Sequence, residues 1–145
     1  MIGGLFDGCA DDTLSPADQL AMDISLIEDY IKEKGLTAAK QPSGLFYSQI
    51  TPGNDIDHPS LSDEVEVTYK GYFLNEDVFD ETKPNKTVEF PLNAVVKGWQ
   101  EGIQLMTKGE KATLLIPSSL GYGPQGTGSI PPNSVLIFDV ELLGF

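Results

Sequence analysis

The sequence "GYGPQG" at residues 121–126 fits the spacing G-x-G-x-x-G, which cradles a phosphate in dinucleotide-binding proteins. That chemistry requires a helix directly after the glycines, because the helix N-terminus holds the pyrophosphate. Here Pro131 and Pro132 follow, and two consecutive prolines lack amide donors and force an extended backbone. No Lys-Ser or Lys-Thr pair closes the loop, as a Walker motif would require. The glycines therefore predict a tight loop between two strands, with Tyr122 at one end and Ile130 at the other.

The composition excludes several other chemistries. The net charge of −13, spread over both halves of the 145-residue chain, argues against a protein that grips nucleic-acid phosphates. Cys9 is the only cysteine, so an internal disulfide and a thiolate metal site are both excluded. His58, the only histidine, lies in the polar stretch "DIDHPS" and is expected in a loop. We therefore expect no metal and no cofactor.

Alternating apolar residues predict an antiparallel sheet in the second part of the chain. Val65, Val67 and Tyr69 would share one face of a strand, with the acids between them on the other. One helical window, residues 93–106, places Val95 or Val96, Trp99 and Ile103 on one face. The fold class is therefore α+β, a sheet wrapped on a single helix. The predicted strands cover residues 45–50, 64–73, 87–92, 111–117 and 134–143.

A separate helix is predicted near the N-terminus. Ser15 can cap it, Pro16 suits the first helical position, Asp18 completes a capping box and Gly35 provides the stop. The stripe on this helix must pack on the following domain or pair with a second copy of the chain, which would make a homodimer. The residues of the stripe are Leu20, Ile24, Ile27 and Ile31.

Four segments together resemble the FKBP-type peptidyl-prolyl cis-trans isomerases. They are "VTYKGYF", "VFDET", "VVKGWQEGIQLMTKGEKATLLIPSSLGYG" and "IPPNSVLIFDVELL", in order between Leu61 and Leu143. The resemblance implies a half-barrel, a twisted antiparallel sheet wrapped on one short α-helix. The leading helix and "GLFYSQITPGND" resemble the N-terminal extension of bacterial members. We expect a flexible lead at 1–14, the N-terminal helix and linker at 15–44, and the isomerase domain at 45–145.

The activity that this resemblance implies is rotation about X-Pro bonds in unfolded or flexible polypeptides. Amide resonance gives that rotation a barrier of about 18–20 kcal/mol. A dry apolar pocket disfavours the charge-separated planar amide, and fixed hydrogen bonds hold the twisted one. No covalent bond breaks, so no nucleophile or cofactor is needed. The family also implies binding of macrolides such as FK506 and rapamycin. The alternative is an FKBP-like binding or chaperone module with little isomerase activity.

The resemblance also assigns site residues. It implies three catalytic side chains, Tyr69, Asp80 and Tyr122, with Asp80 at the pocket edge beside Tyr69. The Tyr122 hydroxyl and the Val96 N–H are expected to donate hydrogen bonds to substrate carbonyls, and Trp99 is expected to form the floor. The residues implied to contact substrate are Phe79, Val88, Phe90, Val95, Val96, Trp99, Ile130 and Phe138.

Each of these residues also has a structural interpretation that the pattern alone favours. Phe90, Trp99 and Phe138 would be ordinary core aromatics. Asp80 would be a turn acid, and Tyr122 a surface aromatic. Only the family motifs shift these residues toward a functional role.

The chain departs from the family pattern at three places. The family often has a basic residue shortly after the F-D pair, and Lys83 or Lys86 is the candidate here. Val88 replaces a common aromatic and predicts a roomier wall. The glycine loop looks about one residue short, with Thr127 and Ser129 near positions often held by a histidine and an apolar residue. These changes predict an altered substrate preference and macrolide affinity.

The N-terminal sequence "MIGGLFDGC" has no basic region and too few apolar residues for a signal peptide or a membrane span. The Gly-Cys pair ending at Cys9 resembles a lipid-anchor site, although Asp7 fits that interpretation poorly. With the bacterial resemblance, these features favour a periplasmic or lipid-anchored location over the cytoplasm, and leave the compartment undecided.

Overall fold

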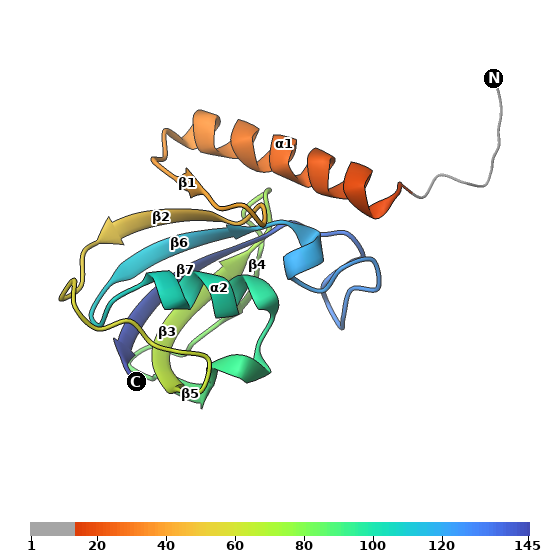
Figure 1. Cartoon of the computed structure of the whole chain (residues 1–145). Coiled ribbons are helices and arrows are strands. Elements are labelled where there is room, and N and C mark those ends of the chain that lie inside the picture. Colours follow the sequence, from red (N-terminus) through yellow and green to blue (C-terminus); the bar gives the residue numbers. More distant parts are fainter. Residues whose placement is uncertain (1–13) are drawn as a thin grey trace, which may run out of the picture.

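The computed structural model describes residues 14–145, and the resulting fold is a curved antiparallel sheet with one helix on each face (Figure 1). The expected lead over residues 1–14 and the anchor at Cys9 fall, apart from Leu14, outside the described residues. Between residues 14 and 145, no helix combines the length and apolar character needed to cross a membrane.

Helix α1 spans Pro16–Lys34 and has the ends that the sequence predicts. The Ser15 Oγ accepts a hydrogen bond from the Asp18 N–H at 3.1 Å, which satisfies one of the free donors of the first turn. Gly35 ends the helix with a φ of 68°, a left-handed conformation that costs little without a Cβ. The capping residues therefore define both ends of α1.

The sheet has the strand order β1-β2-β6-β7-β3-β4, and β5 pairs with the part of β3 that β4 leaves free. All pairings are antiparallel, and the five predicted strands are confirmed. Two short strands were not predicted: β1 lies in the expected linker and β4 in the segment "VFDET". The bounds are β1 Ala39–Lys40, β2 Phe46–Thr51, β3 Glu64–Tyr72, β4 Val78–Glu81, β5 Val88–Pro91, β6 Lys111–Ile116 and β7 Leu136–Gly144.

Helix α2 is shorter than its predicted window and spans Lys97–Leu105. The expectation that Val95 or Val96 lies on a helix face is wrong, because a 3₁₀ helix, η1 (Leu92–Ala94), and an extended stretch precede α2. Val96 is the N-cap of α2, with φ −58° and ψ 154°. Both valines are β-branched, and an extended backbone suits them.

Two glycines allow α2 to lie close to β6. A Cβ built at Gly102 would come within 2.6 Å of the Leu114 side chain, and one at Gly98 within 2.7 Å of the Ile116 side chain. These positions are four residues apart and therefore share one face of the helix. The close approach sets the depth at which Trp99, next to Gly98, enters the concave side of the sheet.

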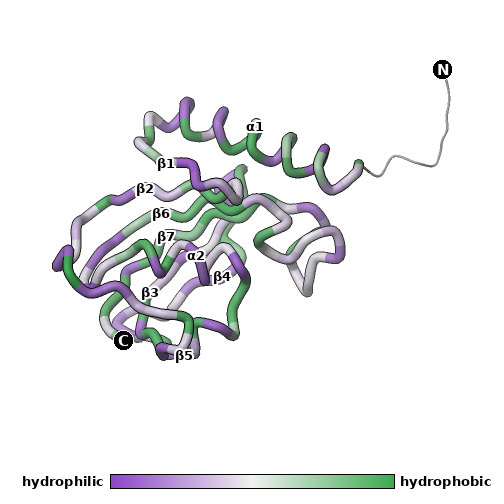
Figure 2. The backbone as a smooth tube through the Cα atoms, in the orientation of Figure 1, coloured by the Kyte–Doolittle hydropathy of each residue, from purple (hydrophilic) through white to green (hydrophobic). Residues whose placement is uncertain are grey.

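The sheet separates two hydrophobic cores. Leu114 belongs to the core beneath α2, and Leu115 to the core beneath α1. In β7, Leu136 and Ile137 divide in the same way. Figure 2 shows these hydrophobic strands between the two helices. Where both faces are covered, the apolar residues run consecutively, at 114–116 in β6 and 136–138 in β7, whereas the rest of β7 alternates and leaves Asp139 exposed.

The α1 stripe packs on the sheet of its own chain, one of the two arrangements that the sequence leaves open. Ile27 is 0% exposed and Tyr30 is buried beside it, against Phe46, Leu115 and Ile137. Ile24 and Ile31 pack partly against the same core. This contact accounts for the apolar stripe without a second copy of the chain.

We expect Ile27→Ala to lower the free energy of unfolding by about 2–5 kcal/mol, because the truncation leaves a cavity between α1 and the sheet. Ile56→Ala is the matched control: Ile56 is 77% exposed, and its truncation should cost less than about 1 kcal/mol. Chemical denaturation at two protein concentrations measures both. Equal losses for the two variants would contradict this packing.

Candidate functional site

A cleft of about 390 Å³ opens on the concave side of the sheet, beside α2. Ten of the eleven residues predicted for the site line it, and the glycine loop adds Thr127, Gly128 and Ser129. The predicted residues at the cleft are Tyr69, Phe79, Asp80, Phe90, Val95, Val96, Trp99, Tyr122, Ile130 and Phe138. They come from β3, β4, β5, the start of α2, the loop after η2 (Ser118–Leu120) and β7.

Val88 is the exception and does not line the cleft. It lies on the same face of β5 as Phe90, because the two are separated by one residue. Val88 pairs with Val67 and Phe90 with Val65, so Val88 lies about 7 Å further along the strand. The structure therefore does not make Val88 a wall of the cleft.

Trp99 lies at the bottom of the cleft and is 5% exposed. Its ring centre is 5.2 Å from that of Tyr69 and 5.1 Å from that of Phe138, both edge-to-face, and 5.4 Å from that of Phe90. Such aromatic pairs add to the free energy of simple burial. The Trp99 Nε1 is buried without a hydrogen-bond partner in the described chain. The indole is thus held by neighbouring rings instead of by a polar contact.

Gly71 on β3 makes room for two of the cleft aromatics. A Cβ at this position would come within 2.7 Å of the Phe138 ring and 2.8 Å of the Phe79 ring. Those two rings meet edge-to-face, with centres 5.5 Å apart. A side chain at position 71 would displace one of them from the cleft.

The polar edge of the cleft is a hydrogen bond between two predicted site residues. The Tyr69 hydroxyl donates to the Asp80 Oδ2 at 2.6 Å. Burial raises the pKa of Tyr69 to about 12, and the hydrogen bond and the charge of Asp80 contribute in the same direction. Tyr69 is therefore a neutral hydroxyl at physiological pH, with its proton directed at the carboxylate.

Asp80 has no basic partner. Lys83 and Lys86 are exposed, and the only ion pair found between residues 14 and 145 joins Lys34 and Glu76. Tyr69 is thus the side chain that contacts the Asp80 carboxylate, through a neutral donor. The candidate basic partners named from the sequence are not brought to the site.

Two donors at the cleft have no partner within the described part of the chain. The Val96 N–H precedes the first turn of α2 and makes no hydrogen bond there. The Tyr122 hydroxyl makes none either, and this side chain is 40% exposed. Each group is available to donate to a carbonyl of a ligand that enters the cleft.

The glycine loop joins β6 to β7 by way of η2, and no helix follows it, as the sequence predicts. Thr127 and Ile130 exchange backbone hydrogen bonds of 2.9 and 2.6 Å, which turns the chain back on itself. Gly126 has a φ of 65°, and a Cβ there would come within 2.4 Å of the Ile130 carbonyl oxygen. The glycine spacing thus serves a tight turn that places Ile130 at the cleft.

The site offers no grouping suited to a metal ion. Across residues 14–145, no cluster of three or more His, Cys, Asp or Glu side chains has the required arrangement. His58 is exposed in the loop before β3, and its Nδ1 lies 3.1 Å from the carbonyl oxygen of Gln104 in α2. The chemistry of the cleft rests on apolar surface, aromatic rings and hydrogen-bond donors.

Comparison with known families gives a match over residues 57–143, to the model of the FKBP-type peptidyl-prolyl cis-trans isomerases. A probable FKBP-type peptidyl-prolyl cis-trans isomerase of Haemophilus influenzae is 47% identical over 112 residues, which are 76% of this chain and 46% of the relative. The macrophage infectivity potentiator of Trypanosoma cruzi is 36% identical over 99% of this chain and 79% of its own length. The chain spans about half the length of two curated relatives, 46% of the Haemophilus influenzae protein and 46% of FkpA from Escherichia coli.

Solved structures agree with the fold. The crystal structure of FkpA from Escherichia coli superposes with a TM-score of 0.77 at 40% identity, over 88% of this chain and 59% of that one. A peptidyl-prolyl cis-trans isomerase from Pseudomonas syringae gives a TM-score of 0.75 at 29% identity, over 91% of this chain and 97% of that one. The half-barrel with an N-terminal helix, predicted from the sequence, is confirmed.

We expect Asp80→Asn to lower the pKa of Tyr69 from about 12 toward, but not to, its ordinary value of 10.0, because burial is the larger cause of the shift. The raised pKa means that Tyr69 favours the folded state below pH 10, and that this contribution is lost as the pH rises from 10 to 12. NMR titration of labelled tyrosines follows this single group. Glu81→Gln, one residue along β4 and on the opposite face, is the control. An unchanged titration in Asp80→Asn would show that the hydrogen bond does not form.

Proposed function

The chain belongs to the FKBP-type peptidyl-prolyl cis-trans isomerase family, and from that premise we propose that it accelerates rotation about X-Pro bonds in polypeptides. One observation carries the proposal most directly: Trp99 is buried by neighbouring rings from the sides, yet lies at the bottom of a cleft that opens to solvent. The floor is flat and apolar, and a prolyl ring is the only ordinary side chain that ends in a compact saturated ring.

The apolar lining accounts for part of the rate. A planar amide is stabilised by charge separation between its oxygen and nitrogen, and this separation is lost as the C–N bond twists. Transfer from water to a cleft of aromatic rings disfavours the planar form relative to the twisted one. Interactions that favour the transition state over the ground state are the ones that raise the rate.

The two hydrogen-bond donors at the cleft confine the rotation to one bond of the peptide. The Val96 N–H and the Tyr122 hydroxyl flank the cleft without partners among residues 14–145, so each can hold one carbonyl of the bound peptide. With the two carbonyls held and the prolyl ring seated on Trp99, rotation is confined to the imide bond between them. Such positioning of donors before reaction avoids reorganisation when the bond twists.

Asp80 and Tyr69 supply the polar element at the edge of the cleft. The carboxylate is oriented by the 2.6 Å hydrogen bond from Tyr69 and is not neutralised by a lysine. Its negative charge faces the side of the cleft where the amide carbonyl carbon of a bound peptide would become more positive as resonance is lost. In this proposal both residues act through electrostatics, and neither transfers a proton.

The substrates follow from the openness of the cleft and from its mostly apolar lining, in which Asp80 is the one acidic side chain. The family acts on proline-containing polypeptides, and we propose unfolded or flexible chains as the substrates of this protein, with assistance to folding as the consequence. FK506-like macrolides, which present a carbonyl beside a saturated ring, are proposed as competing ligands. The affinity of the cleft for these macrolides is expected to be altered, because Val88 does not line the cleft and the 123–130 loop is compact.

The alternative is an FKBP-like binding module with little isomerase activity. No feature of the cleft favours it, because the aromatic floor and walls are in place and the two donors are free. The assay below separates the two functions.

A protease-free kinetic assay on peptides that vary the residue before proline tests the activity. We expect catalysis by the parent protein, inhibition by an FKBP-directed macrolide, and a loss of about tenfold or more in kcat/KM for Trp99→Leu, because the floor for the prolyl ring is removed. Phe145→Leu, an exposed aromatic outside the cleft, should match the parent. Equal rates for Trp99→Leu and the parent would favour the binding module, or an active site elsewhere.

We also propose that the exposed side of α1 supports a homodimer, through side chains other than those of the predicted stripe. Ile27 packs on the sheet, so the available apolar side chains are Leu14, Met22 and Leu26, each 40–43% exposed. Sedimentation at micromolar concentrations should show a two-chain species that Met22→Glu abolishes, because a charge at this contact would be desolvated. A single-chain species across the concentration range would contradict the dimer.

A further inference from the structure

We propose that Asp23, on α1, is a positioning residue for Tyr122, so that the N-terminal helix takes part in building the cleft. This inference rests on the proposed isomerase function. Asp23 is 1% exposed, which is unusual for a carboxylate on the outer helix of a small domain. None of its partners is charged: they are the backbone and side chain of Ser118, 95 residues away, and the side chain of Gln19.

The Asp23 carboxylate is fully engaged. Its Oδ2 accepts hydrogen bonds from the Ser118 N–H at 2.9 Å and from the Ser118 Oγ at 2.5 Å. Its Oδ1 accepts from the Gln19 Nε2 at 2.9 Å, one turn earlier on α1. Hydrogen bonds to an ionised acceptor are short and strong, and a buried one is costly to leave unmade. Ser118 is therefore held firmly against α1.

Ser118 in turn holds the backbone on both sides of Tyr122. Its carbonyl oxygen accepts from the Gly121 N–H at 3.0 Å and from the Gly123 N–H at 2.8 Å. These glycines flank Tyr122 directly. The path from α1 to the cleft is thus Asp23 to Ser118, then Ser118 to the two amides around Tyr122.

Tyr122 depends on this path because its own side chain has few other constraints. It is 40% exposed, and its hydroxyl makes no hydrogen bond among residues 14–145. The place of that hydroxyl is set by the backbone on either side of it. A displacement of about 1 Å in such a group is enough to reduce a rate substantially.

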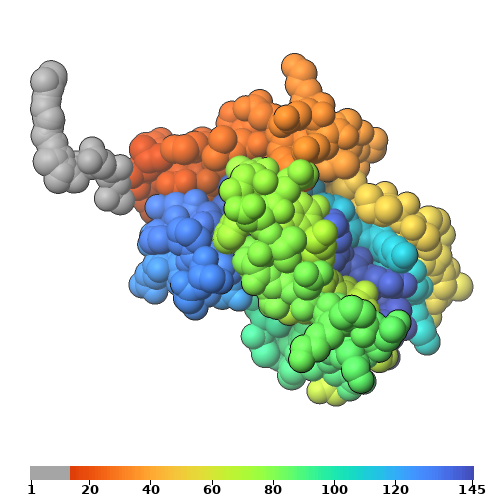
Figure 3. Space-filling view, turned by 180° about the vertical axis from the view of Figure 1, so that it is seen from behind, coloured from red at the N-terminus to blue at the C-terminus, as the bar shows by residue number. Residues whose placement is uncertain are grey.

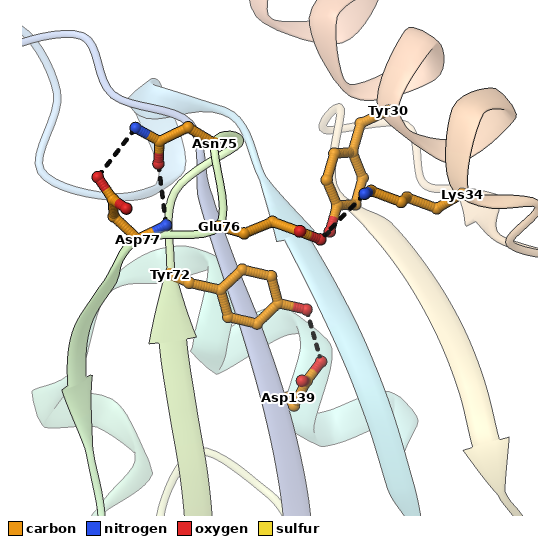
Figure 4. Close-up of polar contacts among 7 residues, drawn as sticks. All are labelled: Tyr30, Lys34, Tyr72, Asn75, Glu76, Asp77 and Asp139. Atoms are coloured by element: carbon orange, nitrogen blue, oxygen red, sulfur yellow. Dashed lines mark hydrogen bonds and ion pairs between the residues drawn. The ribbon is translucent and has the colours of Figure 1, made fainter.

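The helix can act as a brace because it is anchored at both ends. Near Ser118, the side chains of Leu20, Ile24 and Pro117 meet around Gly44. At the other end, the Tyr30 hydroxyl donates to the Glu76 Oε2 at 3.1 Å, and the Lys34 Nζ lies 3.3 Å from the same oxygen (Figure 4). Glu76 lies in the turn between β3 and β4.

The space-filling view shows how α1 lies on both of these regions. The first half of α1 lies against the blue segment between β6 and β7, and the green segment around the β3–β4 turn reaches the second half (Figure 3). β4, which follows that turn, carries Phe79 and Asp80. α1 therefore spans two segments that supply residues to the cleft.

A double-mutant cycle tests the proposal. Tyr122→Phe should lower kcat/KM by about tenfold, the value of one ordinary hydrogen bond, and Asp23→Ala should approach the same loss by displacing that donor. In the Tyr122→Phe background, Asp23→Ala should have less than about a twofold further effect, because the group it positions is already absent. Asp29→Asn, an exposed acid on the same helix, is the charge-matched control and should equal the parent. An equal loss from Asp23→Ala in both backgrounds would overturn the proposal.

A second readout does not depend on activity. A fluorinated tyrosine at position 122 reports the surroundings of that ring by NMR, and its resonance should shift or broaden in Asp23→Ala and stay unchanged in Asp29→Asn. If Asp23→Ala unfolds, Asp23→Asn and Ser118→Ala remove only part of the contact and should show the same effects, reduced in size. An unchanged resonance in a folded Asp23 variant would overturn the proposal. A parent protein without catalysis would instead contradict the proposed function, and the resonance would still test the positioning by Asp23.

Discussion

The contact between α2 and β6 is the constraint on which the site depends. Gly98 and Gly102 remove the side chains that would hold the helix away from Leu114 and Ile116, so α2 lies directly on the concave face of the sheet. Trp99 follows Gly98 and is thereby lowered among Tyr69, Phe90 and Phe138. A helix placed further out would leave the indole in solvent. The cleft exists because the Trp99 indole lies deeper than the smaller aromatic side chains that surround it.

The two cores explain how a helix outside the cleft contacts the segments that form it. β6 and β7 are buried on both faces at residues 114–116 and 136–138, so α1 packs there against the reverse side of the strands that carry Phe138 and lead into η2. The segment that connects β6 to β7 leaves the sheet at the ends of these strands, where α1 crosses it (Figure 1). Asp23 and Tyr30 contact the η2 turn and the β3–β4 turn from this position. Helix α1 can therefore influence the geometry of the cleft, although it packs on the opposite face of the sheet.

Charge has a limited role at the cleft, although the chain carries 22 acidic residues. Asp80 is the one carboxylate in the lining, and its contact is a hydroxyl instead of a lysine. An uncompensated carboxylate beside apolar rings suits a reaction in which charge is redistributed within an amide and no proton is transferred. The other acids between residues 14 and 145 lie mostly on the surface, where they favour solubility.

The sequence by itself determined the local features and, through family motifs, most of the site. The ends of α1 follow from Ser15 and Gly35, because capping joins residues three or four apart. Alternation and motif spacing predicted five strands and ten of the lining residues. Consecutive apolar residues in β6 and β7 were a signal, not used in the prediction, that both faces of the sheet are covered.

Only the tertiary structure decided the rest. Strand β1 has only two residues, and the sequence of β4, V-F-D-E, does not alternate. Both form because neighbouring strands offer free edges. Val95 and Val96 follow the helical pattern, yet they precede the helix. Asp23 has the local pattern of a solvent-exposed helix acid, and its burial depends on a residue 95 positions away. Local patterns record interactions within a few residues, whereas contacts across the fold depend on where whole elements pack.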